Sequence, residues 1–363
     1  MNSNMRAAIV GTGRMGKAIV WAMDKLGCEK FTLIDTNLKS LIDCSKFSNK
    51  HILAIQCNEH NPDYSAVADN DVVISALPYH QTNNLARYCI DHQLPYCDLG
   101  GHIGTSNSIN EYAKNKGSVV MTDLGLAPGW VNILAEHGYN YQPCSITPSG
   151  LFHPQPKTVE MMVGGLPIKP NNYLKYNCTW SYDGLINEYK DHCTVLLNGF
   201  NTLAQGMSGL TNIETSLGPM EAFYTSGGAS HTIATMQKRG VKNCYYKTLR
   251  YRGHCKALKF LINDCGLDNE SLTQLLKVAC PPAPDLVIVK VRVGDYKNFA
   301  DWKEEKIIYS NDTFSAMQMA TAFPISAAAY LIGTGNFKGP LSYSDIPYEE
   351  FETKLEHLFK EAG

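Results

Sequence analysis

The sequence predicts an α/β protein: a doubly wound parallel sheet of the Rossmann type, followed by a second α+β domain with a mainly antiparallel sheet. Short apolar runs alternate with helical patterns over the first 124 residues, which is typical of strands and crossover helices in a parallel sheet. A glycine-rich turn directly follows the first of these runs. Beyond residue 125 the strand-like segments are longer and partly alternate in polarity, which favours an antiparallel sheet with one covered face.

The first domain contains five apolar runs that are typical of buried parallel strands. They cover residues 7–10, 31–35, 52–56, 71–75 and 119–123. Between the first two runs, apolar residues from Met15 to Leu26 recur at helical spacing, and Gly27 is placed to end that helix. Strands and helices therefore alternate as a parallel sheet requires.

The rest of the chain predicts two further parts. Segments 158–163 and 286–293 are expected to be strands of the second sheet, and residues 315–331 a helix that contains Pro324. We therefore expect a dinucleotide-binding domain over residues 1–124 and a substrate and dimerisation domain over 125–314. Residues 315–363 form a C-terminal helical segment.

Composition argues against several classes of partner. A net charge of -2 over 363 residues leaves no basic surface for nucleic acid, and no stretch reaches the roughly 18 apolar residues of a membrane span. The 12 cysteines form no CxxC pair, and they are expected to be reduced, buried thiols of a cytoplasmic protein. No cysteine or histidine pairs have the spacing of a metal site, so no metal is expected.

The run GTGRMG at positions 11–16 predicts a dinucleotide site. Gly11 permits the tight turn after the strand, Gly13 lets the backbone approach the pyrophosphate, and Gly16 lets helix and strand pack closely. Arg14 and Met15 begin the helix, whose unpaired N–H groups and positive dipole end face the phosphates. A glycine turn that binds nothing is the alternative, but the flanking strands and helix supply the context that the motif needs.

Asp35 ends the second strand about twenty residues further on, where an acid binds the adenosine ribose hydroxyls. Its carboxylate would repel a 2′-phosphate, and Thr36 and Asn37 follow where an NADP enzyme more often has an arginine. The expected cofactor is therefore NAD. Four residues at the end of the fourth strand are expected to border the nicotinamide ribose, unless they form an ordinary strand-to-helix turn: Ser75, Ala76, Leu77 and Pro78.

Motifs in the remainder, taken in order, resemble the saccharopine dehydrogenase-like family over nearly the whole chain. They are DLGLAPG (123–129), GGLP (164–167), TWS (179–181), GLINEY (184–189), EAFYTSGG (221–228) and TLRYRGH (248–254). The resemblance implies a homodimer formed through the middle domain. It also implies that the late helix around Phe323 and Pro324 packs back against the Rossmann domain.

Departures from the saccharopine reductases within this family place the chain closest to the lysine 6-dehydrogenases. Val163 stands where those reductases have cysteine, Ala127 where they have aspartate, and Asp183 where they tend to have arginine. Exchanging a cation for Asp183 reverses the local charge, so a substrate with several carboxylates should bind poorly. The resemblance therefore implies NAD-dependent oxidative deamination of the ε-amine of L-lysine, giving 2-aminoadipate 6-semialdehyde and ammonia.

Three residues are candidates for proton transfer. Asp98 and Asp123 each lie near the carboxyl end of a predicted strand, where the nicotinamide is expected, and either could hold the substrate ammonium or act as base. Their alternative is a helix cap or turn residue. His80 is a candidate proton relay and Tyr79 a candidate substrate contact, although a histidine on an exposed loop is the more common case.

The candidate substrate residues of the second domain are charged. Arg250 lies in one of the family motifs and is expected to anchor the α-carboxylate, with a structural ion pair as the alternative. Asp183 and Glu188 are candidates to bind an amino group, or else are solvated surface acids. Two other functions remain open: saccharopine or carboxynorspermidine dehydrogenase or reductase chemistry at a secondary amine, and a non-catalytic NAD-binding sensor.

Overall fold

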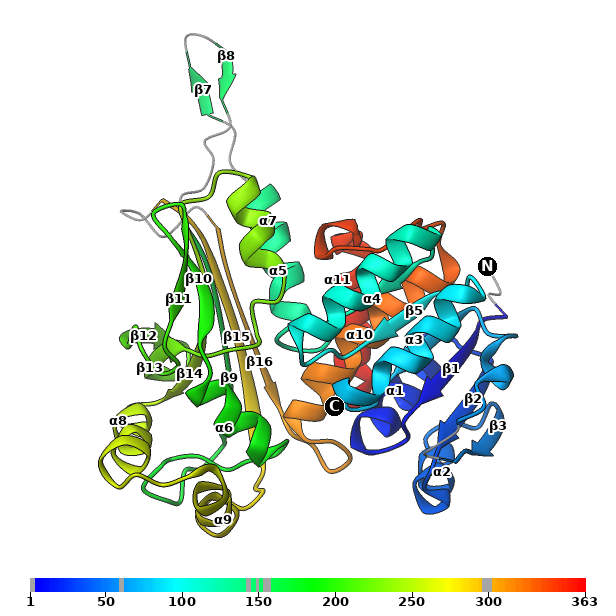
Figure 1. Cartoon of the computed structure of the whole chain (residues 1–363), viewed down its shortest axis with the longest axis horizontal. Helices are drawn as coiled ribbons and strands as arrows, with labels where there is room; N and C mark the ends of the chain where they lie inside the picture. Colours follow the sequence, from blue (N-terminus) through cyan, green and yellow to red (C-terminus); the bar gives the residue numbers. More distant parts are fainter. Residues whose placement is uncertain (1–3, 59–61, 142–144, 148–149, 153–157, 296–301) are drawn as a thin grey trace. The chain divides into compact units, whose positions relative to one another are not determined.

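The computed structural model describes residues 4–58, 62–141, 145–147, 150–152, 158–295 and 302–363. These residues form two compact units, each described here by itself. The first comprises Met1–Ile133 together with Gln318–Gly363, and the second comprises Leu134–Met317. The C-terminal segment thus belongs to the same unit as the N-terminal sheet (Figure 1).

The first unit is built on a six-stranded sheet in which every pair is parallel. Its strands are β1 (Arg6–Val10), β2 (Lys30–Asp35), β3 (His51–Gln56), β4 (Val72–Ser75), β5 (Tyr96–Asp98) and β6 (Val120–Met121). Their order is β3-β2-β1-β4-β5-β6, which is the doubly wound Rossmann order. The predicted fold class is confirmed for this unit.

The helices between these strands are α1 (Arg14–Lys25), α2 (Leu38–Ser45), α3 (Thr82–Asp91) and α4 (Ile103–Lys116). Helix α5 (Trp130–Asn140) follows β6 at the boundary of the units, and most of its residues are buried. In α1 the buried Ala18, Ile19 and Ala22 recur at helical spacing. Gly27 follows the helix with a φ of 94°, a conformation that favours glycine, so the chain leaves α1 there.

The C-terminal helices α10 (Ala316–Thr334) and α11 (Tyr348–Ala362) pack within the first unit. Phe323 of α10 stacks on Trp21 of α1 with ring centroids 5.3 Å apart. Phe359 of α11 lies 5.2 Å from Phe323 and 5.7 Å from Trp130. Among the described residues, α10 alone is long and apolar enough to cross a membrane, but 72% of its apolar window is buried, as in a core helix.

The second unit contains an eight-stranded mixed sheet. Its strands are β9 (Thr158–Pro167), β10 (Cys193–Leu197), β11 (Phe200–Ala204), β12 (Thr211–Thr215), β13 (Gly218–Tyr224), β14 (Asn243–Tyr251), β15 (Asp285–Gly294) and β16 (Trp302–Tyr309). All pairs are antiparallel except β9 with β14, which confirms the mainly antiparallel sheet. Two short strands, β7 (Ser145–Thr147) and β8 (Gly150–Phe152), pair separately.

Strand β9 is longer than the sequence pattern predicts, because Gly164 and Gly165 continue it instead of following it. A Cβ at Gly164 would lie 2.9 Å from the carbonyl oxygen of Leu249, so glycine permits the close approach of β14. The strand predicted at 119–123 is shorter, since Asp123 has a left-handed φ of 60°. Both differences arise from contacts with neighbouring strands and loops.

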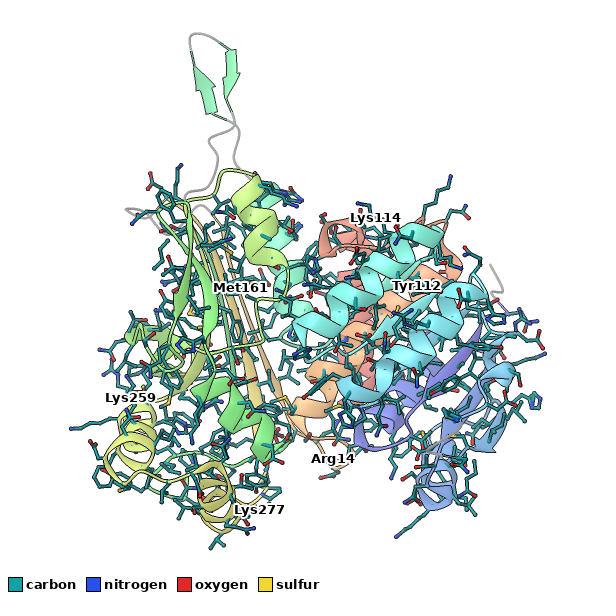
Figure 2. All side chains as sticks on the ribbon, in the orientation of Figure 1. Arg14, Tyr112, Lys114, Met161, Lys259 and Lys277 are labelled. Atoms are coloured by element: carbon teal, nitrogen blue, oxygen red, sulfur yellow. The ribbon has the colours of Figure 1, made fainter. Side chains whose placement is uncertain are left out.

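Helices of the second unit are α6 (Tyr182–Lys190), α7 (Thr232–Lys238), α8 (His254–Lys259) and α9 (Asn269–Ala279), with a π-helical turn at Phe260–Asp264. Apolar side chains of α6, α8 and α9 share one core, which includes Leu185, Leu258 and Leu272. Figure 2 shows the buried Met161 on β9 and the exposed Lys277 on α9. The eleven cysteines of the described residues are free thiols.

Candidate dinucleotide site and candidate substrate residues

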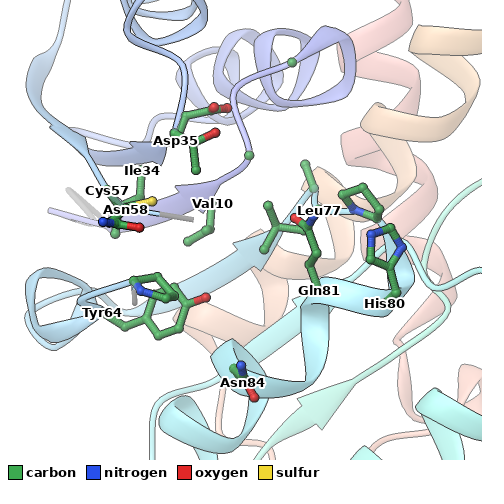
Figure 3. A pocket seen from close by; sticks show the side chains of 16 residues that line it. Val10, Ile34, Asp35, Cys57, Asn58, Tyr64, Leu77, His80, Gln81 and Asn84 are labelled. Carbon is green, nitrogen blue, oxygen red and sulfur yellow. The ribbon is translucent and has the colours of Figure 1, made fainter. Parts of the chain in front are cut away.

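A pocket of about 500 Å³ lies in the first unit at the carboxyl ends of β1 and β4 (Figure 3). These strands adjoin at the point where the strand order reverses, which is where doubly wound sheets bind ligands. Its described lining comprises Val10, Gly11, Gly13, Ile34, Asp35, Thr36, Cys57, Asn58, Pro62, Tyr64, Ala76, Leu77, Pro78, His80, Gln81 and Asn84. The volume suits a small organic ligand.

The three motif glycines occupy three different environments. Gly11 has a φ of 94°, and a Cβ there would lie 2.9 Å from the Ala76 carbonyl. A Cβ at Gly16 would lie 2.1 Å from the Gly11 oxygen, so this glycine lets α1 approach the turn. A Cβ at Gly13 would meet nothing within 4 Å, which leaves space beside the helix N-terminus for a pyrophosphate. The turn therefore fits a dinucleotide.

Arg14 and Met15 occupy the first turn of α1, directly after Gly13 at the N-cap. The backbone carbonyl of Arg14 accepts a hydrogen bond from the Gln318 side chain at 3.0 Å, which ties the start of α1 to α10. Neither Arg14 nor Met15 is among the described residues that line the pocket. Their contribution is the helix N-terminus rather than a side chain in the pocket.

Asp35 lies at the end of β2 and lines the pocket. Its Oδ2 accepts hydrogen bonds from the backbone N–H and the hydroxyl of Thr12, at 2.6 and 2.9 Å, and its Oδ1 accepts from the Asn37 N–H at 2.8 Å. These bonds fix the carboxylate beside the glycine turn. Among the described lining residues there is no lysine or arginine to offset its charge, so a 2′-phosphate would meet repulsion here.

The loop after β4 forms the opposite wall of the pocket. Ser75 is the fully buried last residue of β4, and Ala76, Leu77 and Pro78 line the pocket after it. The Ala76 N–H donates to the Val10 carbonyl at 2.8 Å, which joins this loop to β1.

His80 lies on the 3₁₀ turn Tyr79–Gln81 and lines the same pocket. Tyr79 is 43% exposed and stacks on His102 with ring centroids 5.3 Å apart. The structure thus places His80, but not Tyr79, among the described residues that line the dinucleotide pocket. Pocket residues that the sequence reading did not single out come from separate segments, namely Cys57, Asn58, Tyr64, Gln81 and Asn84. Of these, only Cys57 could have been expected from the sequence, because it directly follows the predicted third strand.

The structure brings the two predicted aspartates of the first unit together, both buried. The Asp123 N–H donates to Asp98 Oδ1 at 3.1 Å, and the Tyr96 hydroxyl donates to Asp98 Oδ2 at 3.0 Å. The Ser106 hydroxyl donates to Asp123 Oδ1 at 2.7 Å. A Cβ at Gly100 would lie 2.0 Å from that same oxygen, so a glycine is needed beside it.

Burial, together with the negative charge of the neighbouring Asp123, raises the pKa of Asp98 to about 7. Two buried carboxyl groups this close favour a state in which one of them is protonated. Near neutral pH the pair can therefore hold or release one proton. Asp98 also accepts the N–H that fixes Asp123 in its left-handed conformation, so it has a structural task as well.

In the second unit, Arg250 of β14 is 3% exposed. Its Nε–H donates to the Tyr189 hydroxyl at 2.8 Å and its Nη1 donates to the Leu249 carbonyl at 2.9 Å. The guanidinium lies over the rings of Tyr176 and Tyr189, 4.8 and 5.7 Å from their centroids. Within the described residues Nη2 has no hydrogen-bond partner, so this buried cation retains unused donors.

Glu188 of α6 is half-buried beside this arginine. Burial raises the pKa of its carboxyl to about 7, although the positive charge of Arg250 acts in the opposite direction. No direct ion pair joins the two side chains among the described residues, so neither charge is used in a salt bridge with the other. Asp183 is exposed in the first turn of α6, where it accepts a hydrogen bond from Thr273 at 3.2 Å. The structure thus groups Glu188, but not Asp183, with Arg250.

The sequence reading gave Glu221 no role of its own. Its Oε2 accepts the Gly253 N–H at 2.9 Å and its Oε1 the Cys255 N–H at 2.6 Å, which satisfies the start of α8. Glu221 also pairs in register with Arg250 across β13 and β14. In the part of the chain that the structure describes, no group of three or more histidine, cysteine or acidic side chains could hold a metal ion.

A six-stranded sheet in Rossmann order with this turn and pocket defines a dinucleotide-binding protein. Two family models match the chain, and their boundary falls near residue 123. Residues 7–122 match the saccharopine dehydrogenase NADP binding domain, and residues 125–358 match the saccharopine dehydrogenase C-terminal domain. The chain belongs to the saccharopine dehydrogenase family, as its motifs predict, and its first unit is a nicotinamide dinucleotide binding domain.

Curated relatives are similar at low identity. A mitochondrial alpha-aminoadipic semialdehyde synthase of Mus musculus is 23% identical over 292 residues, which is 78% of this chain and 30% of that protein. A saccharopine dehydrogenase [NADP(+), L-glutamate-forming] of Schizosaccharomyces pombe is 25% identical over 251 residues, which is 65% of this chain and 52% of that protein. The chain therefore spans a third to a half of these relatives.

A solved structure shares the fold. Apo saccharopine dehydrogenase (L-Glu forming) from Saccharomyces cerevisiae has a TM-score of 0.73 and covers 98% of this chain and 97% of that chain. Sequence identity with it is 14%, so the likeness concerns the fold. The domain model and the fission yeast relative name NADP, whereas the carboxylate of Asp35 predicts NAD. The choice between NAD and NADP therefore depends on the charges that line the pocket.

Proposed function

We propose that this protein is an NAD-dependent amino-acid dehydrogenase that removes the ε-amine of L-lysine, yielding 2-aminoadipate 6-semialdehyde and ammonia. The observation that carries the proposal is a pair of charges in the second unit, the buried Arg250 and the half-buried Glu188, which no ion pair joins among the described residues. Arg250 offers unused N–H groups to one carboxylate, and Glu188 beside it suits one amino group. One cation and one acid match the α-carboxylate and α-amine of a single amino acid.

The number of buried cations favours lysine over a substrate with three carboxylates such as saccharopine. Among the described residues of the second unit, Lys247 and Arg250 are the buried cations. Side chains alternate along β14, so Lys247 faces the other side of the sheet from Arg250. There its Nζ donates to the Gly209 carbonyl and the Thr211 hydroxyl.

Asp35 supports NAD as the cofactor. Its carboxylate lines the pocket beside the glycine turn, and no described lining residue supplies a countercharge for a 2′-phosphate. Bound NAD would accept the hydride from the ε-carbon. The glycine turn supplies N–H groups to the pyrophosphate, which fixes the position of the dinucleotide.

Proton transfer requires a base for the substrate ammonium, and three residues of the first unit can supply it. Asp98 with Asp123 can hold one proton near neutral pH, and His80 lines the dinucleotide pocket. Loss of hydride from the neutral amine leaves a protonated imine, and water converts that cation to the aldehyde and ammonium. The semialdehyde then cyclises through its α-amine.

A spectrophotometric assay with both cofactors tests the proposal. Purified protein should form NADH on addition of L-lysine, and ammonia should appear in equal amount. Reduction of cofactor by saccharopine, with no response to lysine, would contradict it. The name of the Schizosaccharomyces pombe relative favours that second candidate, an NADP-dependent saccharopine dehydrogenase. A homodimer is also proposed, and light scattering on the purified protein tests it.

A further inference from the structure

The orientation of Arg250 is set by Tyr189 and His254, which lie in two of the family motifs but have no role in the proposed chemistry. We infer that Tyr189 and His254 are positioning residues, which turn the free edge of the Arg250 guanidinium toward a carboxylate of the substrate. This inference rests on the proposed function in taking that carboxylate to belong to an amino acid. The hydrogen bonds themselves involve only the second unit.

A chain of hydrogen bonds with one direction runs from Arg250 to the backbone. His254 Nδ1 lies 2.8 Å from the Leu174 carbonyl, which can only accept, so Nδ1 carries the proton. In the neutral ring Nε2 is then an acceptor, and the Tyr189 hydroxyl donates to it at 3.0 Å. The Tyr189 oxygen is left to accept the Nε–H of Arg250 at 2.8 Å.

The charge state of His254 keeps this direction constant. Burial and the nearby positive charge of Arg250 together lower the pKa of His254 to about 3. Other titratable groups close to Arg250 include Glu188, Tyr176, Tyr189 and Tyr246, and burial raises the pKa of each of them. The ring therefore stays neutral from about pH 5 upward, so it cannot become a second donor to the Tyr189 hydroxyl.

His254, which ends this chain of hydrogen bonds, is held rigidly. His254 is the first residue of α8, and Glu221 binds the N–H groups on both sides of it, at Gly253 and Cys255. The His254 ring also packs against Phe223 and Tyr176, with centroids 6.4 and 5.4 Å away. A fixed imidazole fixes the Tyr189 hydroxyl, and that hydroxyl fixes the rotation of the guanidinium.

The orientation determines which donors remain. Nε is used by Tyr189 and one N–H of Nη1 by Leu249, so the unused donors are Nη2 and the second N–H of Nη1. These groups lie on the edge of the guanidinium that can bind a carboxylate through two parallel hydrogen bonds. A rotated guanidinium would keep its charge but lose this bidentate geometry.

Kinetics of matched variants test the inference. Tyr189→Phe should raise the KM for L-lysine about ten-fold, because the freed guanidinium must be ordered on binding. The KM for cadaverine, which is lysine without its carboxylate, should not change, nor should the KM for NAD. Tyr251→Phe is the control. Tyr251 is the neighbour of Arg250 in β14, and this exchange removes a hydroxyl that donates to the Pro167 carbonyl at 3.0 Å instead of contacting Arg250.

Two exchanges at His254 test whether the hydrogen-bond acceptor at the Nε2 position matters or only the size of the side chain. Glutamine can place an amide oxygen where Nε2 accepts from Tyr189, whereas asparagine reaches only the Nδ1 position. His254→Gln should therefore keep the lysine KM within about two-fold of the parent, and His254→Asn should behave like Tyr189→Phe. An equal rise of KM for lysine and cadaverine in these variants would indicate a purely structural role and overturn the inference.

A measurement that needs no turnover separates this inference from the proposed function. In ¹⁵N-labelled protein the His254 ring should be the neutral Nδ1–H tautomer at pH 6. Acetate at constant ionic strength, with chloride as the reference anion, should shift the Arg250 side-chain resonances. Tyr189→Phe should weaken that acetate response about ten-fold. Absence of an acetate response, or the other tautomer, would reject the positioning role even if lysine is a substrate. If the tautomer and the acetate response are as expected but the protein does not turn over lysine, only the proposed function is rejected.

Discussion

Asp35 accepts both the backbone N–H and the hydroxyl of Thr12, at 2.6 and 2.9 Å, which joins the end of β2 to the middle of the glycine turn. Thr12 is fully buried, so these bonds are shielded from water. The residue that would bind the adenosine ribose therefore also helps to shape the turn that would bind the pyrophosphate. Cofactor choice and cofactor affinity are coupled through this one carboxylate.

Asp35→Ser should move cofactor preference toward NADP. Loss of the carboxylate removes the acceptor for the ribose hydroxyls and the repulsion of a 2′-phosphate, so affinity for NAD should fall about 10- to 100-fold. Affinity for NADP should fall much less or rise. Dissociation constants from fluorescence titration with both reduced dinucleotides measure this directly. Asp43→Ser, which removes an acid on α2 that pairs with Lys46, should leave both constants unchanged.

Alanine at two glycines of the turn should have opposite effects. Gly13→Ala places a methyl group where nothing lies within 4 Å, so stability should change little while dinucleotide affinity falls at least ten-fold. Gly16→Ala places a methyl group 2.1 Å from the Gly11 oxygen and should lower the free energy of unfolding by about 1–3 kcal/mol. Thermal melts with and without NADH compare the two. Equal destabilisation by both would contradict the assigned roles.

The first unit could be predicted from sequence because its signals are local. Apolar runs mark five of the six strands, all except β5, although β3 at the sheet edge is largely exposed and not buried as predicted. The spacing of Gly11, Gly13 and Gly16 needs only one turn and one helix. The end of the last predicted strand of this unit, at residues 119–123, was less predictable. Asp123 was placed in a strand by its apolar neighbours, but its φ of 60° follows from the hydrogen bond to Asp98, 25 residues earlier.

The second unit shows why the candidate substrate residues could be named but not connected. Arg250, Tyr189 and His254 come from β14, α6 and α8, and the partner carbonyl of Leu174 lies 80 residues from His254. No periodic pattern encodes such a chain, because each bond depends on strand register and helix packing. For the same reason Glu188 and Asp183, both acids of α6, were indistinguishable in sequence but differ in burial in the structure.

Asp98 should make stability depend on pH near neutrality. Its pKa is raised from 3.8 to about 7, so the folded state binds a proton that the unfolded state has lost. The stabilising contribution is complete below about pH 4 and is lost as pH rises toward 7, with a slope of about 1 kcal/mol per pH unit. Urea unfolding of the parent and of Asp98→Asn between pH 5 and 7.5 should show the parent losing stability relative to the variant.

Asp43→Asn is a suitable comparison for that experiment. Its hydrogen bond with Lys46 lowers the pKa of Asp43, so this carboxyl titrates below the range measured. Its difference from the parent should therefore stay constant between pH 5 and 7.5. A parallel course for Asp98→Asn and the parent would mean that Asp98 is ionised throughout, and the pair would then not hold a proton near neutral pH.

Glu188→Gln should reveal whether this acid binds the α-amine. The parent should bind lysine better as pH rises through about 7, because ionised Glu188 can pair with an ammonium group and its protonated form cannot. The variant should show a lysine KM about ten-fold higher at pH 8 and should lose this part of the pH dependence. Toward 6-aminohexanoate, which lacks the α-amine, parent and variant should have the same KM. Glu270→Gln, at the exposed start of α9, controls for loss of a surface acid. A KM for 6-aminohexanoate that rises as much as that for lysine would show that Glu188 supports the fold around Arg250 without binding the α-amine.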